Sequence, residues 1–207
     1  MDYIFQERTN ILVEPATPDG SLIIAFHGGY GSPLDFQTTL NIESVCPDSY
    51  VLYVDAADDN GDLWRSGTNG TDVAYVHSLY QKVIYDYPLI NASNVHLIGH
   101  SNGGMMVYKV AAFLDELNFK TLTILAGCYM CPEIFDSQAS VYHVHGDEDS
   151  IVPIAGNALY PSLAQTKLKV KVAARWAKFL ELQDVGHQLP EILNEFTLED
   201  IKRHMGL

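Results

Sequence analysis

The chain has 207 residues, 47% of them hydrophobic and 18% charged, a composition typical of one globular domain with a sizeable core. The 26 acidic and 12 basic side chains give a formal net charge of −14, which disfavours binding to nucleic-acid phosphates or anionic lipid surfaces. No stretch has the ~18 to 20 apolar residues of a membrane-spanning helix, and the start lacks a secretion signal. We expect a single domain over residues 1–207 and a cytoplasmic location, while the oligomeric state stays open.

Short apolar runs alternate along the chain with longer segments of helical periodicity. Helical patterns cover residues 71–87, 101–117 and 189–205, the last as one terminal helix. This order predicts an α/β fold in which a doubly wound, mainly parallel sheet has helices on both faces. The runs of strand length, each ending in Gly or Asp, are Leu22–Gly29, Val51–Asp55, Val95–Gly99, Thr121–Gly127 and Val141–Gly146.

The segment Gly99-His100-Ser101-Asn102-Gly103 lies between a predicted strand and a predicted helix and fits the pattern G-x-S-x-G. A serine on so sharp a turn has a strained backbone, and side chains two residues before and after it would collide with the strand and the helix. Gly99 and Gly103 avoid these collisions, which favours Ser101 as a nucleophile. The alternative is an ordinary glycine-rich turn or a phosphate loop, but G-x-G-x-x-G and G-K-[ST] patterns are absent.

A serine nucleophile needs a histidine as base and a carboxylate that orients it. His187 follows a strand-like run and a glycine and precedes a helix, which makes it the best-placed histidine after Ser101. The acid is expected directly after the strand Val141–Gly146, where either Asp147 or Asp149 fits. Spacing alone leaves this choice open, and the acidic run is also compatible with a solvated loop.

Two further features follow predicted strands. Gly28 and Gly29 let the backbone approach a substrate closely, so an N–H of this loop and that of Asn102 are expected to stabilise an oxyanion. Cys128 and Cys131 have C-x-x-C spacing but follow a strand instead of opening a helix, and we interpret them as incidental thiols. No metal and no organic cofactor is expected.

Taken together, these segments resemble the α/β-hydrolase superfamily, and more narrowly the esterases related to polyhydroxybutyrate depolymerases and feruloyl esterases. The resemblance runs over residues 22–190 through "HGGYGS", "WRSGTNGTDVAYV", "VHLIGHSNGGMM", "HGDEDSIVP", "AARWAKF" and "GHQLP". It implies that Asp149 is the acid, His187 the base and Gly29 the second oxyanion donor. It also implies that Trp64 lines the substrate pocket, although a position in the core fits this tryptophan equally well; Tyr30 is a second candidate for the pocket. The sequence has no long insertion that could form a lid, so we expect a minimal lid or none.

The expected activity is hydrolysis of small acyl or aryl esters through an acyl-enzyme on Ser101, with a small-molecule ester as the partner. A thioesterase, an acyltransferase or a peptidase could use the same residues, and a substrate panel with competing nucleophiles would separate them. A non-catalytic binding protein with this fold is the alternative from another class. Covalent labelling of Ser101 by a fluorophosphonate would exclude it.

Overall fold

The three-dimensional structure of the protein is a computed structural model, and it describes residues 1–57, 63–65, 71–131, 138–173 and 176–207. Within these residues eight strands form one sheet in the order β1-β2-β4-β3-β5-β6-β7-β8. The strands from β3 to β8 pair in parallel, whereas β1 pairs antiparallel with β2, and β2 with β4. The strands are β1 Asp2–Phe5, β2 Arg8–Val13, β3 Leu22–Phe26, β4 Tyr50–Val54, β5 Val95–His100, β6 Thr121–Leu125, β7 Ser140–Gly146 and β8 Trp176–Leu182.

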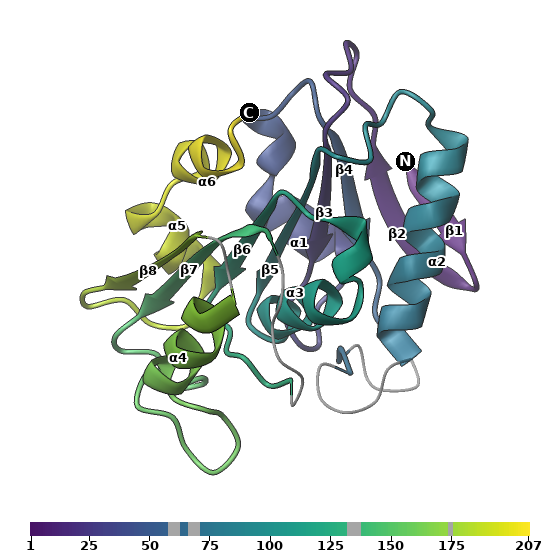
Figure 1. The fold of residues 1–207 in the computed structure, drawn as a ribbon. Coiled ribbons are helices and arrows are strands. Elements are labelled where there is room, and N and C mark those ends of the chain that lie inside the picture. The colour runs from purple at the N-terminus through teal and green to yellow at the C-terminus, as the bar shows by residue number, and fades with distance from the viewer. Residues whose placement is uncertain (58–62, 66–70, 132–137, 174–175) are drawn as a thin grey trace.

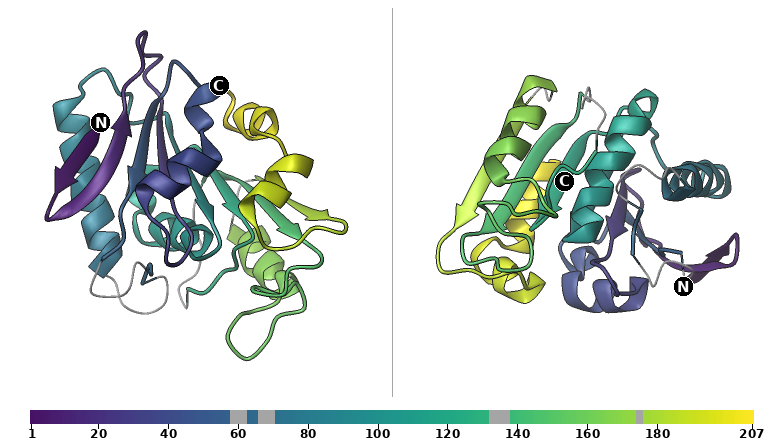
Figure 2. Two further views of the ribbon diagram at one scale, coloured as in Figure 1. Left: turned by 180° about the vertical axis from the view of Figure 1, so that it is seen from behind. Right: turned by 90° about the horizontal axis from the view of Figure 1, so that it is seen from below.

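Helices cover both faces of the sheet, as Figure 2 shows in the view from below. One face packs against α2 (Thr71–Asp86), α3 (Asn102–Phe113) and α4 (Leu163–Ala173). The other packs against α1 (Pro33–Leu40), α5 (Leu189–Glu195) and α6 (Leu198–Met205). Because both faces are covered, β3, β4 and β6 are buried along their whole length, which explains their unbroken apolar sequences.

The predicted doubly wound α/β sheet is confirmed, with several differences. The helices α1 and α4 were not predicted. The first two strands extend the sheet antiparallel at one edge, a part of the chain for which the sequence analysis predicted no element. The helix after Ser101 ends at Phe113, and residues 115–117 form a separate 3₁₀ turn. The predicted terminal helix is two helices, because Thr197 caps a new one: its side chain accepts from the N–H of Asp200, whose carboxylate accepts from the N–H of Thr197.

The carboxyl ends of the parallel strands meet along the lower edge of the sheet in Figure 1. The segments that carry the predicted site residues follow β3, β4, β5, β7 and β8. No helix among the described residues has both the length and the apolar character needed to cross a membrane.

Candidate active site

Ser101 occupies a strained turn between β5 and α3. Its φ of 55° and ψ of −120° lie outside the usual regions for a residue with a side chain, as the sequence predicted. The flanking glycines make this turn possible. A Cβ atom on Gly99 would lie 2.3 Å from the carbonyl oxygen of Gly103, and one on Gly103 would lie 2.1 Å from the carbonyl oxygen of Phe26. The turn is therefore fixed by contacts between backbone atoms, with Ser101 at the start of α3.

His187 lies between β8 and α5, and its ring reaches the serine. The distance from its Nε2 to Oγ of Ser101 is 2.8 Å. The loop is fixed by His100, whose Nε2–H donates to the carbonyl oxygen of His187 at 2.8 Å. Burial lowers the pKa of His100 to about 4, so its ring is neutral at physiological pH. His100, the residue before Ser101, thus holds the loop of His187 in place.

Asp149 contacts the other nitrogen of the His187 ring. Its Oδ2 lies 2.7 Å from Nδ1 of His187, and its Oδ1 accepts the backbone N–H groups of Ile151 and Val152 at 2.9 and 2.8 Å. Burial raises the pKa of Asp149, but hydrogen bonds from His145, His187 and the Val152 N–H outweigh it and hold the pKa well below its usual range. Asp149 therefore stays ionised at neutral pH.

Asp147, the other candidate for the acid, lies in the same loop but is exposed to solvent. Its backbone N–H donates to the carbonyl oxygen of Leu182 at 2.9 Å, which anchors the loop to the end of β8. The structure thus brings Asp149 to His187 and leaves Asp147 at the surface.

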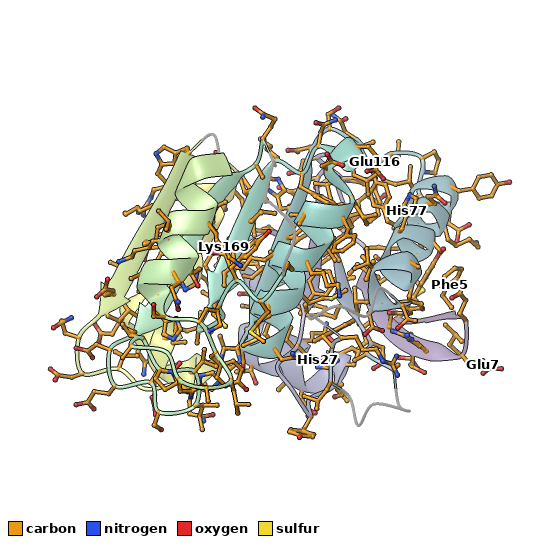
Figure 3. All side chains as sticks on the ribbon, turned by 60° about the horizontal axis from the view of Figure 1, so that its bottom comes forward. Phe5, Glu7, His27, His77, Glu116 and Lys169 are labelled. Atoms are coloured by element: carbon orange, nitrogen blue, oxygen red, sulfur yellow. The ribbon has the colours of Figure 1, made fainter. Side chains whose placement is uncertain are left out.

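The loop after β3 lies beside the serine. Figure 3 labels His27 at the start of this loop. A Cβ atom on Gly28 would lie 3.7 Å from Cβ of Ser101, and one on Gly29 would lie 3.7 Å from Cβ of Asn102. The side chain of Asn102 bonds the backbone of Trp64, accepting from its N–H at 2.6 Å and donating to its carbonyl oxygen at 3.3 Å. The two loops that were predicted to hold an oxyanion are therefore neighbours.

A cleft of about 680 Å³ opens over these residues. Tyr30 lines it and is 79% exposed, in agreement with its predicted place at the pocket. Its apolar lining also includes side chains that the sequence analysis did not single out, among them Leu63, Met105, Met130, Ile151 and Tyr160.

The prediction that Trp64 forms a wall of this cleft was wrong. Trp64 is 3% exposed and packs edge-on against Phe26, and its indole N–H donates to the carbonyl oxygen of His27 at 2.9 Å. Because the ring satisfies its donor inside the core, it is a packing residue beneath the loop. Its neighbour Leu63 reaches the cleft instead.

Several other residues with reactive side chains take no part in the hydrogen bonds between Ser101, His187 and Asp149. His77 is on α2, His96 is buried against Thr121, and the ring of His204 bonds the carbonyl oxygen of Leu122 (Figure 3 labels His77). The three cysteines are buried, and burial raises the pKa of Cys128 to about 12. A thiol so fully protonated is a weak nucleophile.

Comparison with known proteins identifies the family. The family model described as phospholipase/carboxylesterase matches residues 9–204. The chain belongs to this family. No curated protein matches it with significant similarity.

Solved structures with the same fold cover almost the whole chain. A carboxylesterase from Bacillus cereus has a TM-score of 0.74 at 17% identity, covering 97% of this chain and 94% of its own. The acetyl xylan esterase from Aspergillus awamori has a TM-score of 0.72 at 15% identity, covering 96% and 94%. Arabidopsis thaliana SOBER1 has a TM-score of 0.63 at 16% identity, covering 89% and 99%. The α/β-hydrolase fold is thereby confirmed, and the protein is a hydrolase of the carboxylesterase type.

Proposed function

We propose that this carboxylesterase hydrolyses small, neutral acyl or aryl esters through a covalent intermediate on Ser101. The observation that carries the proposal is the continuous set of hydrogen bonds from Oγ of Ser101 through His187 to Asp149. A serine hydroxyl becomes a strong nucleophile when a base takes its proton, and this geometry supports that transfer.

In the first half of the proposed reaction, Oγ of Ser101 attacks the ester carbonyl carbon while its proton moves to Nε2 of His187. Asp149 orients the ring and stabilises the imidazolium that forms. The carbonyl oxygen becomes an oxyanion, which the N–H groups of Gly29 and Asn102 would stabilise. When the tetrahedral intermediate collapses, the ester C–O bond breaks and the leaving alcohol takes the proton from His187.

In the second half, water attacks the acyl-enzyme and gives a proton to Nε2 of His187. A second tetrahedral intermediate then collapses, the acid leaves, and Oγ of Ser101 regains its proton from the ring. Each proton taken up by His187 is returned within its half-reaction, so hydrolysis consumes one water molecule and leaves the enzyme unchanged.

The charge of the cleft supports a neutral substrate. Among the described residues that line it, Asp35 carries the only carboxylate side chain, and none is Lys or Arg. Substrates with phosphate groups, such as phospholipids or coenzyme A thioesters, are commonly bound through cationic side chains, which the described lining of this cleft does not provide. The net charge of −14 further repels such anions. An uncharged ester placed against the apolar lining fits these properties better.

The decisive variant is Ser101→Ala, assayed with p-nitrophenyl acetate. By analogy with other serine hydrolases, we expect kcat to fall by on the order of 10⁶ while the protein stays folded. Ser93→Ala is the matched control. Ser93 is exposed and precedes the amino end of β5, whereas Ser101 follows its carboxyl end. Near-wild-type hydrolysis by a folded Ser101→Ala protein would rule out the proposed nucleophile.

A substrate panel then defines the class. We expect turnover of acetyl and butyryl p-nitrophenyl esters, with octanoyl esters and methyl ferulate setting the limits for acyl length and for aryl acids. Thioesters, amides and added alcohols as competing acceptors test whether the same residues act as a thioesterase, a peptidase or an acyltransferase. A clear preference for any of these over simple esters would replace the esterase proposal.

A further inference from the structure

A chain of buried side chains approaches Asp149 from the side opposite His187. Nε2 of His145 lies 3.0 Å from Oδ2 of Asp149 and 2.8 Å from the carbonyl oxygen of Val152. Nδ1 of His145 lies 3.2 Å from Nε2 of His143, and Nδ1 of His143 lies 2.8 Å from the hydroxyl of Tyr108. The exposed fractions of His145, His143 and Tyr108 are 2%, 0% and 0%.

When the rings of His143 and His145 are neutral, each carries one N–H, and the hydrogen-bond partners of each ring determine which nitrogen carries it. Nε2 of His145 faces two acceptors, a carboxylate and a carbonyl oxygen, so it is the N–H and its Nδ1 is the acceptor. His143 must therefore donate from Nε2, which leaves its Nδ1 to accept from the hydroxyl of Tyr108. Burial keeps both groups uncharged, because it holds the pKa of His143 well below and that of Tyr108 well above their ordinary values.

The rings are also held in place by packing. His143 and His145 are two residues apart on β7 and point to the same face of the sheet, with their ring planes 11° apart. The ring of Phe179, on the neighbouring β8, stacks on His143 at 5.3 Å. Tyr108 lies on α3, the helix that begins directly after Ser101. The chain of hydrogen bonds thus joins the helix of the serine to the strand that leads to Asp149.

We propose that His145 is a positioning residue for Asp149, and that His143 and Tyr108 hold its ring in the tautomer that donates to the carboxylate. This inference rests on the proposed function of Ser101, His187 and Asp149. Nδ1 of His187 lies 2.7 Å and Nε2 of His145 lies 3.0 Å from Oδ2 of Asp149, and Oδ1 accepts two backbone N–H groups. The one N–H on Nε2 of His145 is shared between this carboxylate and the carbonyl oxygen of Val152. Four donors fix the plane of the carboxylate, and therefore the direction in which it orients His187.

Through Asp149, His145 also affects how readily His187 accepts a proton. A carboxylate that shares its charge with more donors is a weaker acceptor, so it stabilises the protonated ring of His187 less. The titratable groups that face this site are His143 and His145 from β7, Cys128 from the loop after β6, and His100 from the end of β5. Loss of the His145 donor should therefore shift the acid limb of the pH–rate profile to higher pH.

The test compares His145→Leu with His145→Gln, because the side-chain amide of glutamine can supply an N–H where Nε2 lies. We expect His145→Leu to lower kcat by on the order of 10- to 100-fold with little change in KM, since one charge-assisted hydrogen bond is lost. Its acid limb should move to higher pH. His145→Gln should recover most of kcat and the wild-type limb. Equal losses in both folded variants, with an unmoved acid limb, would show that the ring only packs.

A measurement that needs no activity covers the case in which either variant fails to fold. The ¹⁵N chemical shifts of the histidine rings in the wild-type protein report which nitrogen carries the proton. We expect the Nε2–H form for both His143 and His145, and a changed His143 signal in Tyr108→Phe. An Nδ1–H form of His145 would overturn the inference. A wild-type protein that hydrolyses no ester would contradict the proposed function instead, leaving the ring assignments as a separate result.

Discussion

The turn that carries Ser101 and the loops that carry Asp149 and His187 are fixed by different kinds of contact. The turn depends on backbone atoms that approach each other where Gly99 and Gly103 have no side chain. The loops depend on hydrogen bonds between side chains and on backbone N–H groups that meet a carboxylate. Substitutions in the turn should therefore affect folding first, and substitutions in the loops should affect catalysis first.

The largest effect is expected for Gly103→Ala. Its Cβ would lie 2.1 Å from the carbonyl oxygen of Phe26, and a backbone atom in the middle of the sheet cannot move aside. We expect a loss of at least about 3 kcal/mol in the free energy of unfolding, measured by urea denaturation, and loss of esterase activity with it.

Gly206→Ala is the control for that variant. Gly206 ends α6 with a φ of 73°, and no atom lies within 4 Å of the added Cβ. Only backbone strain remains, so we expect a cost of about 1 kcal/mol and unchanged activity. Equal stability of the two variants would mean that close backbone packing does not fix the turn.

The next largest effect is expected for Asp149→Asn, which places an amide where the carboxylate orients His187. Other serine hydrolases with this change lose on the order of 10⁴ in kcat while remaining folded. Asp147→Asn, in the same loop but exposed, should keep nearly full activity. Steady-state kinetics on a short-chain ester measures both, and the reverse ranking would move the acid to Asp147.

A smaller, graded effect is expected when the pH is lowered. Burial lowers the pKa values of His96 and His100 to about 3 and about 4, so the unfolded chain binds their protons near pH 6.5 while the folded chain does not. Stability is therefore lost as pH falls below about 6.5, by about 1.4 kcal/mol per pH unit for each such histidine. Asp149, whose pKa is depressed, keeps its charge and its contribution through this range.

Two readouts check this pH dependence. Urea denaturation between pH 7 and pH 5 should give a falling free energy of unfolding, and a flat value would contradict the burial of neutral rings. Activity should fall reversibly between about pH 7 and pH 6, before the protein unfolds, because a protonated imidazole cannot accept the proton of Ser101. A rate that stays constant from pH 5 to pH 9 would exclude a histidine base.

The sequence was most informative where local geometry dictates residue type. The glycines around Ser101 predicted its strained turn, and the unbroken apolar runs predicted buried parallel strands, because each signal lies within a few residues. The break between α5 and α6 also had a local signal, since Thr197 and Asp200 form a capping box. It was missed because the apolar periodicity continues across the break. β1 has four residues, none of them buried, at the edge of the sheet, and the neighbouring β2 begins with the polar residues Arg8, Thr9 and Asn10, so the apolar pattern of both strands is weak.

Features that depend on contacts distant in sequence could not be predicted in the same way. Asp147 and Asp149 differ in burial, which the order of residues does not reveal. The place of Trp64 was misjudged because its donor bonds a residue 37 positions away in the chain. His145 lay visibly beside the acidic residues, but its contact with Asp149 requires the turn after β7, and its link to Tyr108 requires α3 to pack on the sheet.

The most direct test of the proposed nucleophile is covalent labelling with a fluorophosphonate, followed by mass spectrometry of the digested protein. We expect one modification on the peptide that contains Ser101, slowed when an excess of a short-chain ester is present during labelling and absent from Ser101→Ala. Labelling of Ser101→Ala to the same extent, or modification of a different serine in the wild-type protein, would contradict the proposed site.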